Sequence, residues 1–373
     1  MRPLEDVVVL DFSSLVPGPL ATLILAEAGA RIIKVERPGS GEEMRSYHPR
    51  WAGESSNFAL LNRNKESISL NLKDPQDLAR LEPLVARADV LVEQFRPGVM
   101  DRLGLGYEHV SKINRKIVYC SITGYGQNGP LRDEAGHDLN YIAKSGLLAL
   151  SRGTPVTPVI PPALIADIAG GTYPAVINIL LALRQRDRTG AGSRLDIAMA
   201  DNTFTFLYWA LGTGAATGEW PGNGSDLVTG GTPRYRLYAA ADGVMIAVAP
   251  IEQRFWNIFC EIIALDPSWR DDSQDMAGTM REVKRIIASR PSADWERLFA
   301  GKDCCCCVVR DLKDALDDPQ FRSRGLFDHR LSHEGLSMPA LPVPVAPAFR
   351  GDPAVGTVPR VGGANASALA AEE

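Results

Sequence analysis

The sequence predicts an α/β protein with a doubly wound parallel sheet in its large domain, followed by a smaller α+β domain. Residues 1–125 alternate between short β-branched runs and helical patterns, as parallel strands joined by crossover helices do. A chain of 373 residues exceeds the size of one simple core, so two domains are expected. Further along, two apolar runs meet at Asp242-Gly243, which is a strong signal for an antiparallel hairpin.

The elements of the large domain follow from local patterns. The strand VVVLDF precedes the helix PGPLATLILAEAGA, which has Pro19 near its start and Gly29 near its end. Asp74 and Pro75 begin a further helix, in which leucines recur at helical spacing. The other expected elements of this half are the strands RIIKVERPG, SISLNL, DVLVEQF and IVYCSIT, and a helix from about Val99.

The second half of the chain mixes helices with a hairpin. After a proline-containing loop, the stretch DIAGGTYPAVINILLALRQR predicts a helix with Asp167 at a cap position. The strand SRLDIAM and the helix NTFTFLYWALGT follow, and then a Gly/Thr/Ser-rich linker at 212–232. The hairpin is followed by helices near 255–265, 293–299 and 311–316, and by an extended Pro/Ala/Gly-rich tail from about Leu341. We therefore expect a large domain at 1–211, a linker and small domain at 212–324, and a C-terminal segment at 325–373.

Composition limits the classes of function. Hydrophobic residues at 45% and charged residues at 23% are ordinary for a globular protein. The net charge of −5 argues against nucleic acid as a partner, although it allows a local arginine cluster for a small phosphorylated ligand. The N-terminus has no long apolar region, and no run of the sequence reaches transmembrane length. We therefore expect a cytoplasmic protein without a membrane partner.

Four of the six cysteines are contiguous, from Cys304 to Cys307. Zinc sites favour spaced pairs of cysteines, so adjacent residues are poorly suited to hold one ion, and we expect no metal. The run continues into two valines, and free cysteine packs like a small hydrophobic residue. A buried strand is therefore favoured over a metal or redox site.

The stretch GYGQNG, from Gly124 to Gly129, formally matches the glycine pattern of dinucleotide-binding proteins. That pattern requires a helix next and an acidic residue about 20 positions later. Pro130 and a polar segment follow instead, and no acidic residue occurs at 139–166. A tight turn is favoured over a nicotinamide site.

Basic residues recur where the strands of the large domain should end, and open α/β sheets bind ligands at the carboxyl ends of their strands. Arginine is suited to bidentate contacts with phosphate. Solvated surface charge remains the alternative for any single residue, but the repeated placement favours a shared anionic ligand. The residues are Arg37, Arg63, Lys65, Arg96 and Arg102.

Three ionisable residues lie in apolar or glycine-rich surroundings: His137, Asp167 and Glu252. Asp167 and Glu252 could each cap a helix, and His137 could close a turn. Their spacing in the sequence does not show whether they meet in space.

Several long stretches resemble the class III CoA-transferase (CaiB/BaiF) superfamily and, within it, the α-methylacyl-CoA racemases. The resemblance covers most of the chain and lies in PGPLATLILAEAGARIIKVERPG, NRNKESISLNLK, ADVLVEQFRPGVMDRLGLGYE, GYGQNGP, AGHDLNYIAKSGLL, IADIAGG, GGTPRYRLYAAADGVMIAVAPIEQRF and DPQFRSRG. The sequence departs from the family at IADIAGGT, which lacks one glycine, and at Gln253, where the family has proline. The cysteine run also replaces a C-x-x-P-V segment. These departures bear on substrate fit more than on the acid–base residues.

The resemblance implies a racemase that inverts the carbon α to a thioester by proton transfer through an enolate. It implies that His137, oriented by Glu252, and Asp167, hydrogen-bonded to Asp138, supply the two bases. It also implies that the five basic residues bind CoA, which is part of an acyl-CoA thioester substrate, so no separate cofactor is expected. The transferases of the superfamily share the aspartate, on which they form acyl intermediates, but usually lack the histidine. CoA transfer on Asp167 is thus the alternative, and a non-catalytic acyl-CoA-binding protein is a third possibility.

The residue types suit the racemase chemistry. Inversion needs two bases on opposite sides of the carbon, one of which enters protonated. Histidine titrates near neutral pH, and a carboxylate can do so when burial raises its pKa. The N-terminus of the helix that Asp167 begins could stabilise the enolate oxygen. The resemblance further implies a homodimer of interlocked chains, with each site between the large domain of one chain and the small domain of the other.

Overall fold

The computed structural model describes residues 2–151 and 158–369. The chain forms two compact units, each built from segments that are distant in the sequence. The first unit contains residues 1–145, 163–205 and 319–373, and the second contains 146–162 and 206–318. The sequence predicted domains at 1–211 and 212–324 with a C-terminal segment at 325–373, and it did not assign 146–162 to the second unit.

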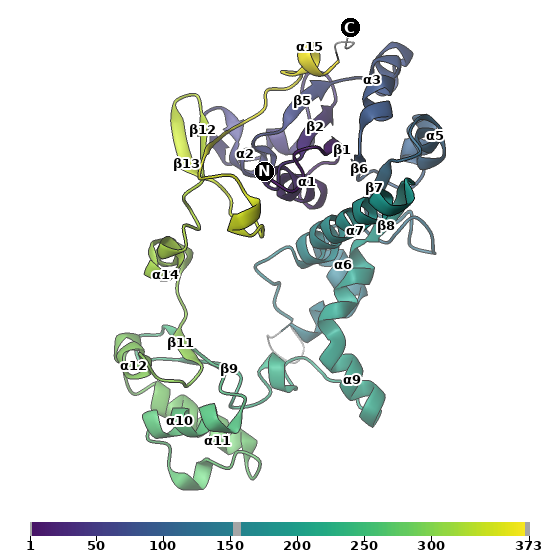
Figure 1. Cartoon of the computed structure of the whole chain (residues 1–373). Helices are drawn as coiled ribbons and strands as arrows, with labels where there is room; N and C mark the ends of the chain where they lie inside the picture. The colour runs from purple at the N-terminus through teal and green to yellow at the C-terminus, as the bar shows by residue number, and fades with distance from the viewer. Residues whose placement is uncertain (1, 152–157, 370–373) are drawn as a thin grey trace. The chain divides into compact units, whose positions relative to one another are not determined.

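A six-stranded parallel sheet forms the centre of the first unit (Figure 1). Its strand order is β5-β2-β1-β6-β7-β8, so the order reverses between β1 and β6. The α/β class and the parallel sheet predicted from the sequence are therefore confirmed. The strands are β1 (Val8–Phe12), β2 (Arg31–Glu36), β5 (Glu66–Ser69), β6 (Val90–Glu93), β7 (Val118–Thr123) and β8 (Ser193–Ala198).

Helices cover both faces of this sheet, because its strands carry apolar side chains on both sides. On one face, strand residues such as Leu10 and Leu91 pack with α3 and α5 in one apolar cluster. On the other face lie α1 and α7, which contact each other and the strands. The helices of this unit are α1 (Pro17–Glu27), α2 (Ser56–Asn62), α3 (Pro75–Arg87), α4 (Val99–Arg102), α5 (Tyr107–Ile113), α6 (Asp138–Lys144), the π-helix η3 (Ala166–Thr172), α7 (Tyr173–Thr189) and α8 (Met199–Asn202).

The C-terminal segment packs on the first unit. Leu331, Val343 and Val358 lie in one apolar cluster with α1 and α2. Ser69 N–H donates to Asn365 Oδ1 at 2.8 Å, which ties the end of the chain to β5. The tail from Leu341 is thus not simply extended, because it contains β14 (Val355–Thr357) and α15 (Asn365–Ala368). Before it lie α14 (Pro319–Ser323), β12 (Arg330–His333) and β13 (Leu336–Pro339).

The second unit contains the predicted hairpin, with Gly243 at a φ of +82° in its turn. The hairpin and β11 form a three-stranded antiparallel sheet that packs on helices through Trp256, Phe259 and Trp295. Its elements are α9 (Tyr208–Thr217), β9 (Arg236–Ala239), β10 (Met245–Val248), α10 (Gln253–Ile262), α11 (Met276–Ile287), α12 (Ser292–Phe299), β11 (Cys306–Val308) and α13 (Leu312–Asp317).

The sequence patterns missed several short or irregular elements. These are α2, α6 and α11, and the small β3–β4 hairpin (Arg50–Trp51 with Glu54–Ser55). The expectation of a buried cysteine strand was only partly right: Cys304 is buried, but Cys305 and Cys307 are exposed.

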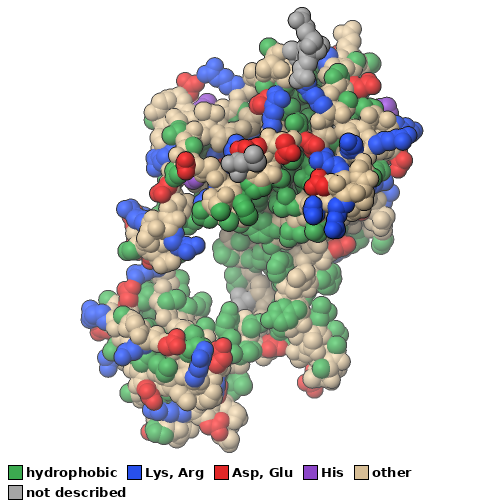
Figure 2. Space-filling view, in the orientation of Figure 1, with side chains coloured by type: hydrophobic (Ala, Val, Ile, Leu, Met, Phe, Trp, Pro, Cys, Tyr) green, Lys and Arg blue, Asp and Glu red, His purple; other side chains and the backbone are tan. Residues whose placement is uncertain are grey.

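On the face drawn in Figure 2, basic and acidic side chains are intermixed and do not form one broad basic surface. One helical stretch, Ala166–Thr189, is long and apolar enough to cross a membrane by length and composition alone, which the sequence analysis did not anticipate. This is weak evidence for a membrane span, because the same stretch contacts β7, β8 and α1 as a core helix of the sheet does.

Candidate active site

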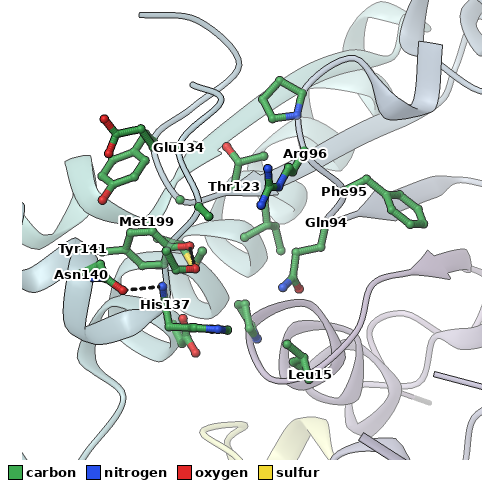
Figure 3. A pocket seen from close by; sticks show the side chains of 18 of the residues that line it. Leu15, Gln94, Phe95, Arg96, Thr123, Glu134, His137, Asn140, Tyr141 and Met199 are labelled. Atoms are coloured by element: carbon green, nitrogen blue, oxygen red, sulfur yellow. Dashed lines mark hydrogen bonds between the residues drawn. The ribbon is translucent and has the colours of Figure 1, made fainter. Parts of the chain in front are cut away.

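A cavity of about 520 Å³ opens at the carboxyl ends of β1, β6 and β7. This is the point where the strand order of the sheet reverses, and open α/β sheets bind ligands there. Its lining comes from the loops after these strands, from the start of α6 and from η3, all within the first unit. Figure 3 shows His137 and Tyr141 on one side, with Gln94 and Arg96 on the other.

His137 lines this cavity as the N-cap residue of α6. Its backbone N–H donates to Asn140 Oδ1 at 3.1 Å, so a side chain one turn into the helix fixes the start of α6 (Figure 3). The imidazole is exposed to the cavity. His137 therefore closes the turn before α6 and also lines the cavity. A structural role and a functional role for this residue are compatible.

Two glycines allow Tyr141 to approach the backbone on either side of this loop. A Cβ atom at Gly124 would lie 2.4 Å from the Tyr141 ring, and one at Gly136 would lie 2.8 Å from it. The tyrosine hydroxyl donates to the Gly136 carbonyl oxygen at 2.5 Å, directly before His137. The first glycine of GYGQNG is thus required by packing. The motif forms a turn, as predicted, and this turn lines the cavity.

Asp167 lines the same cavity from the first turn of η3. The expectation that it caps the helix is wrong, because η3 begins at Ala166 and the N-cap residue is Ile165. Its backbone N–H donates to Asp138 Oδ1 at 2.9 Å. The N–H of Asp167 therefore already has an acceptor, and stabilisation of an enolate oxygen by the N-terminus of this helix stays a prediction. π-Helical turns of this kind occur frequently at functional sites.

The surroundings of Asp167 favour its protonated form. Partial burial, with a further contribution from the charge of Asp138, raises its pKa from 3.8 to about 6, and His137 opposes this shift. Asp138 is itself buried and does not line the cavity, so it acts on Asp167 through the hydrogen bond and its charge. His137 and Asp167 thus line one cavity, and Asp138 is hydrogen-bonded to the backbone of Asp167, while their catalytic roles stay predictions. The raised pKa brings the carboxyl of Asp167 into the range useful for proton transfer at neutral pH.

Glu252 belongs to the second unit, where it is the N-cap residue of α10. Its side chain makes no capping hydrogen bond, so helix capping does not explain why a glutamate occupies this position. The structure gives no placement of Glu252 relative to His137, and its supporting role stays a prediction.

A second cavity of about 430 Å³ lies at the carboxyl ends of β1, β2, β5 and β6. Ser14 and Phe95 line both this cavity and the first, so the two adjoin. Arg37 lines the second cavity and donates from Nε to the Gly41 carbonyl oxygen at 2.7 Å. Lys73 also lines the second cavity. The sequence analysis did not name it as a ligand-binding residue, although it follows strand β5 in the same way that Arg37 follows β2.

Arginines also gather near the first cavity. Arg96 lines it and is exposed. Arg102 is exposed on α4, and a Cβ atom at Gly98 would lie 3.4 Å from its Nη1 and 4.0 Å from Nη2 of Arg132. Arg132, which also lines the cavity, was missed because it follows no strand directly. The lining of the two cavities and the adjoining α4 therefore present several guanidinium groups.

The structure does not support ligand contacts by Arg63 and Lys65, and we withdraw that prediction. Lys65 is buried, with its Nζ 3.1 Å from Asp11 Oδ2 and 2.8 Å from Thr22 Oγ1. Arg63 is buried against Glu27 at 2.8 Å and donates to the Leu341 carbonyl oxygen. Both cations stabilise the core. A basic residue near the end of a strand can do this or bind a ligand, and its position in the sequence does not distinguish the two roles.

Within 2–151 and 158–369, no group of three or more His, Cys, Asp or Glu side chains could hold a metal ion. The chemistry that the lining residues can provide is proton transfer, nucleophilic attack by a carboxylate and binding of an anion.

An open α/β sheet with a cavity at its switch point, lined by His137, Asp167 and arginines, is typical of enzymes that bind small ligands at this edge. More specifically, the chain belongs to CoA-transferase family III, whose family model matches residues 4–364. Members of this family act on acyl-CoA thioesters, either as racemases or as CoA-transferases.

Characterised relatives fall into both groups at similar identity. The chain is 32% identical over 360 residues to alpha-methylacyl-CoA racemase from Homo sapiens, covering 95% of this chain and 90% of the relative. It is 33% identical over 354 residues to acetyl-CoA:oxalate CoA-transferase from Acetobacter aceti, covering 92% and 89%. Overall identity therefore does not distinguish the two reactions.

Solved structures match over nearly the whole chain. The D175A mutant of Rv3272 from Mycobacterium tuberculosis aligns with a TM-score of 0.85 and 27% identity, covering 99% of both chains. A CAIB/BAIF family protein from Brucella suis aligns with a TM-score of 0.82 and 26% identity, covering 98% of both chains.

Proposed function

We propose that this protein is a racemase of 2-methylacyl-CoA thioesters, in which His137 and Asp167 are the two bases. One observation carries the proposal: both side chains line a single cavity at the switch point of the sheet. A transferase would need the carboxylate alone, as the nucleophile that carries the acyl group. The histidine at this position has no task in that reaction.

The proposed reaction is a proton transfer in two steps. One base removes the proton from the α-carbon, whose C–H electron pair moves into the thioester to form an enolate. The other base, which began protonated, then delivers its proton to the opposite face of the same carbon. The reverse reaction exchanges the two roles. The raised pKa of Asp167, about 6, suits this exchange, because its carboxyl can then both hold and release a proton near neutral pH.

CoA binding is assigned to the arginines that remain exposed: Arg37, Arg96 and Arg102. The two adjoining cavities offer room for a nucleotide beside the thioester, and Phe95 lines both of them. Arg132 joins this set because its guanidinium converges with that of Arg102 at Gly98. Phosphate groups bind such clusters through charge-assisted hydrogen bonds.

The proposed assembly is an interlocked homodimer in which Glu252 of one chain orients His137 of the other. Support comes from α7, where apolar side chains at helical spacing remain exposed in the single chain. These are Tyr173, Ile177, Leu180 and Leu181. Exposed apolar stripes of this kind mark interaction surfaces. The proposed location is the cytoplasm.

Solvent exchange tests the proposed reaction. A single epimer of a 2-methylacyl-CoA is incubated with the protein in deuterated water, without any acceptor acid. We expect deuterium at the α-carbon together with loss of optical purity. His137→Ala and Asp167→Ala should abolish both, whereas Lys144→Ala, at the far end of α6, should leave them unchanged. A wild-type protein that introduces no deuterium would refute the racemase proposal.

CoA transfer to a carboxylic acid is the alternative, because its family relatives are equally similar. In that reaction Asp167 attacks the thioester carbonyl and the CoA thiolate leaves. Turnover would then require a free acid acceptor and would survive His137→Ala. If the protein bound acyl-CoA with neither activity, it would be a binding protein.

A further inference from the structure

The cysteine run is not used by the proposed function, and its geometry separates it into two kinds of thiol. Cys304 is 1% exposed and Cys306 is partly buried, and both pack on the apolar core of the second unit. Cys305 and Cys307 are exposed. The inner cysteines are therefore Cys304 and Cys306, and the outer ones are Cys305 and Cys307.

The backbone between the two inner cysteines is bent. Cys305 has a φ of +51°, in the left-handed region that residues other than glycine adopt uncommonly. In a fully extended strand, Cα atoms two residues apart are separated by about 6.7 Å, near the upper limit of ~6.8 Å for a disulfide. A left-handed residue between them shortens this span. The bend thus favours a disulfide between the two cysteines more than a fully extended strand would.

The two thiols are in contact. Cys306 Sγ donates to the Cys304 carbonyl oxygen at 3.1 Å, and the two side chains are hydrogen-bonded to each other. The hydrogen bond from Cys306 lowers the pKa of Cys304 to about 7, while the same interaction raises the pKa of Cys306. A thiolate therefore forms on Cys304 near neutral pH, while Cys306 keeps its proton. The thiolate is the reactive form of cysteine.

We propose that Cys304 and Cys306 form a dithiol that low-molecular-weight disulfides, such as oxidised glutathione, convert to an intrachain disulfide. Cys306 is the sulfur in reach of solvent, and it attacks the small disulfide once its proton has moved to Cys304. One small thiol leaves and takes up a proton. Cys304 then attacks the mixed disulfide at the Cys306 sulfur, and the second small thiol leaves with the other proton. Two electrons pass from the protein to the small disulfide, and no other oxidant is needed.

The proposed disulfide lies next to the chain segment that leads to Glu252 in the second unit. Ala249 N–H donates to the Cys305 carbonyl oxygen at 3.0 Å, so the bend is tied to the chain that leads to Glu252. Cys306 is paired with Val248 in the sheet, which holds the bend at the edge of β10. The dithiol itself stands independently of the proposed racemase reaction.

Differential alkylation of the full-length protein tests this proposal. The protein is equilibrated with oxidised and reduced glutathione, and free thiols are blocked with iodoacetamide in denaturant. After reduction, the newly freed thiols are labelled with N-ethylmaleimide. Trypsin releases all four cysteines in one peptide, DCCCCVVR, whose fragment ions locate each label. We expect N-ethylmaleimide on Cys304 and Cys306, and iodoacetamide on Cys305 and Cys307.

Two serine variants provide the comparison. Cys304→Ser should lose the disulfide, whereas the double change Cys305→Ser with Cys307→Ser should retain it. The positions of the two labels in the wild-type protein test the proposal even if a variant fails to fold. Iodoacetamide on both Cys304 and Cys306 at a fully oxidising glutathione ratio would overturn the proposal. So would glutathione adducts on the exposed cysteines alone, or a disulfide that persists in Cys304→Ser.

Discussion

Replacing Asp167 by asparagine is expected to stabilise the protein at neutral and alkaline pH while it abolishes activity. Asparagine keeps the size of the side chain but carries no charge. The folded protein raises the pKa of Asp167 from 3.8 to about 6, a difference of about two units. At about 1.36 kcal/mol per unit, ionising this carboxyl costs the folded state about 3 kcal/mol. Because the side chain is partly exposed, screening reduces the expected gain to ~1–2 kcal/mol.

The sign of the effect follows from proton binding. The folded state holds the proton of Asp167 more tightly than the unfolded chain does. The wild-type protein therefore loses free energy of unfolding as pH rises from about 4 to about 6, and the deficit is complete above that. Asp167→Asn should be more stable than the wild type at pH 8 and gain little at pH 4.

Urea unfolding at both pH values measures this difference, with amide hydrogen exchange of β7 reporting on the first unit. Asp187→Asn, at an exposed position on α7, serves as the control and should show no such pH-dependent gain. An Asp167→Asn protein that is equally or less stable than the wild type at pH 8 would refute the reasoning. Ionisation of Asp167 would then not lower the free energy of unfolding.

The remaining predictions concern the loop, the core and a second buried carboxyl. Gly136→Ala places a Cβ atom 2.8 Å from the Tyr141 ring, so it should displace His137 and lower the exchange rate by ~10–100-fold, measured by deuterium incorporation. Lys65→Met removes one of the two lysines that compensate the buried charge of Asp11, the other being Lys34, and should cost about 3 kcal/mol in urea unfolding, with no specific change in KM for the thioester. Burial raises the pKa of Glu93 to about 7, so Glu93→Gln should remove a loss of thermal stability that the wild type shows between about pH 4.5 and 7. An unchanged pH profile in that variant would contradict the assignment.

The sequence predicted the regular part of the fold well, because its signals are local. The β-branched runs gave the strands of the six-stranded sheet, and Asp74 with Pro75 gave the start of α3. Helix α6 was missed because its start is stabilised by an asparagine one turn later and by a tyrosine wedged between glycines. Those contacts are visible only in three dimensions.

The candidate site was predicted in part, for a physical reason. His137, Asp138 and Asp167 share one site, and the resemblance to known enzymes identified them even though their spacing did not. Arg63 and Lys65 were predicted to contact a ligand because they lie where strands of the large domain were expected to end. Their pairing with buried carboxylates depends on Asp11 and Glu27, which lie far from them in the sequence. Charge patterns alone do not separate an internal ion pair from a binding residue.

The π-helical turn at η3 has a consequence for insertions and deletions. A π-turn holds more residues than an α-turn, as if one residue had been added to an ordinary helix. Each residue in an α-helix advances the direction of the side chain by about 100°. Removing a single residue, such as Ala169, would return this stretch to a regular helix while α7 stays packed on the sheet. Asp167 would then swing by about that angle away from the wall it shares with His137. The number of residues in this π-helical turn thus sets the direction of the Asp167 carboxyl. A protein that lacks Ala169 would fold normally but would have no second base in the cavity.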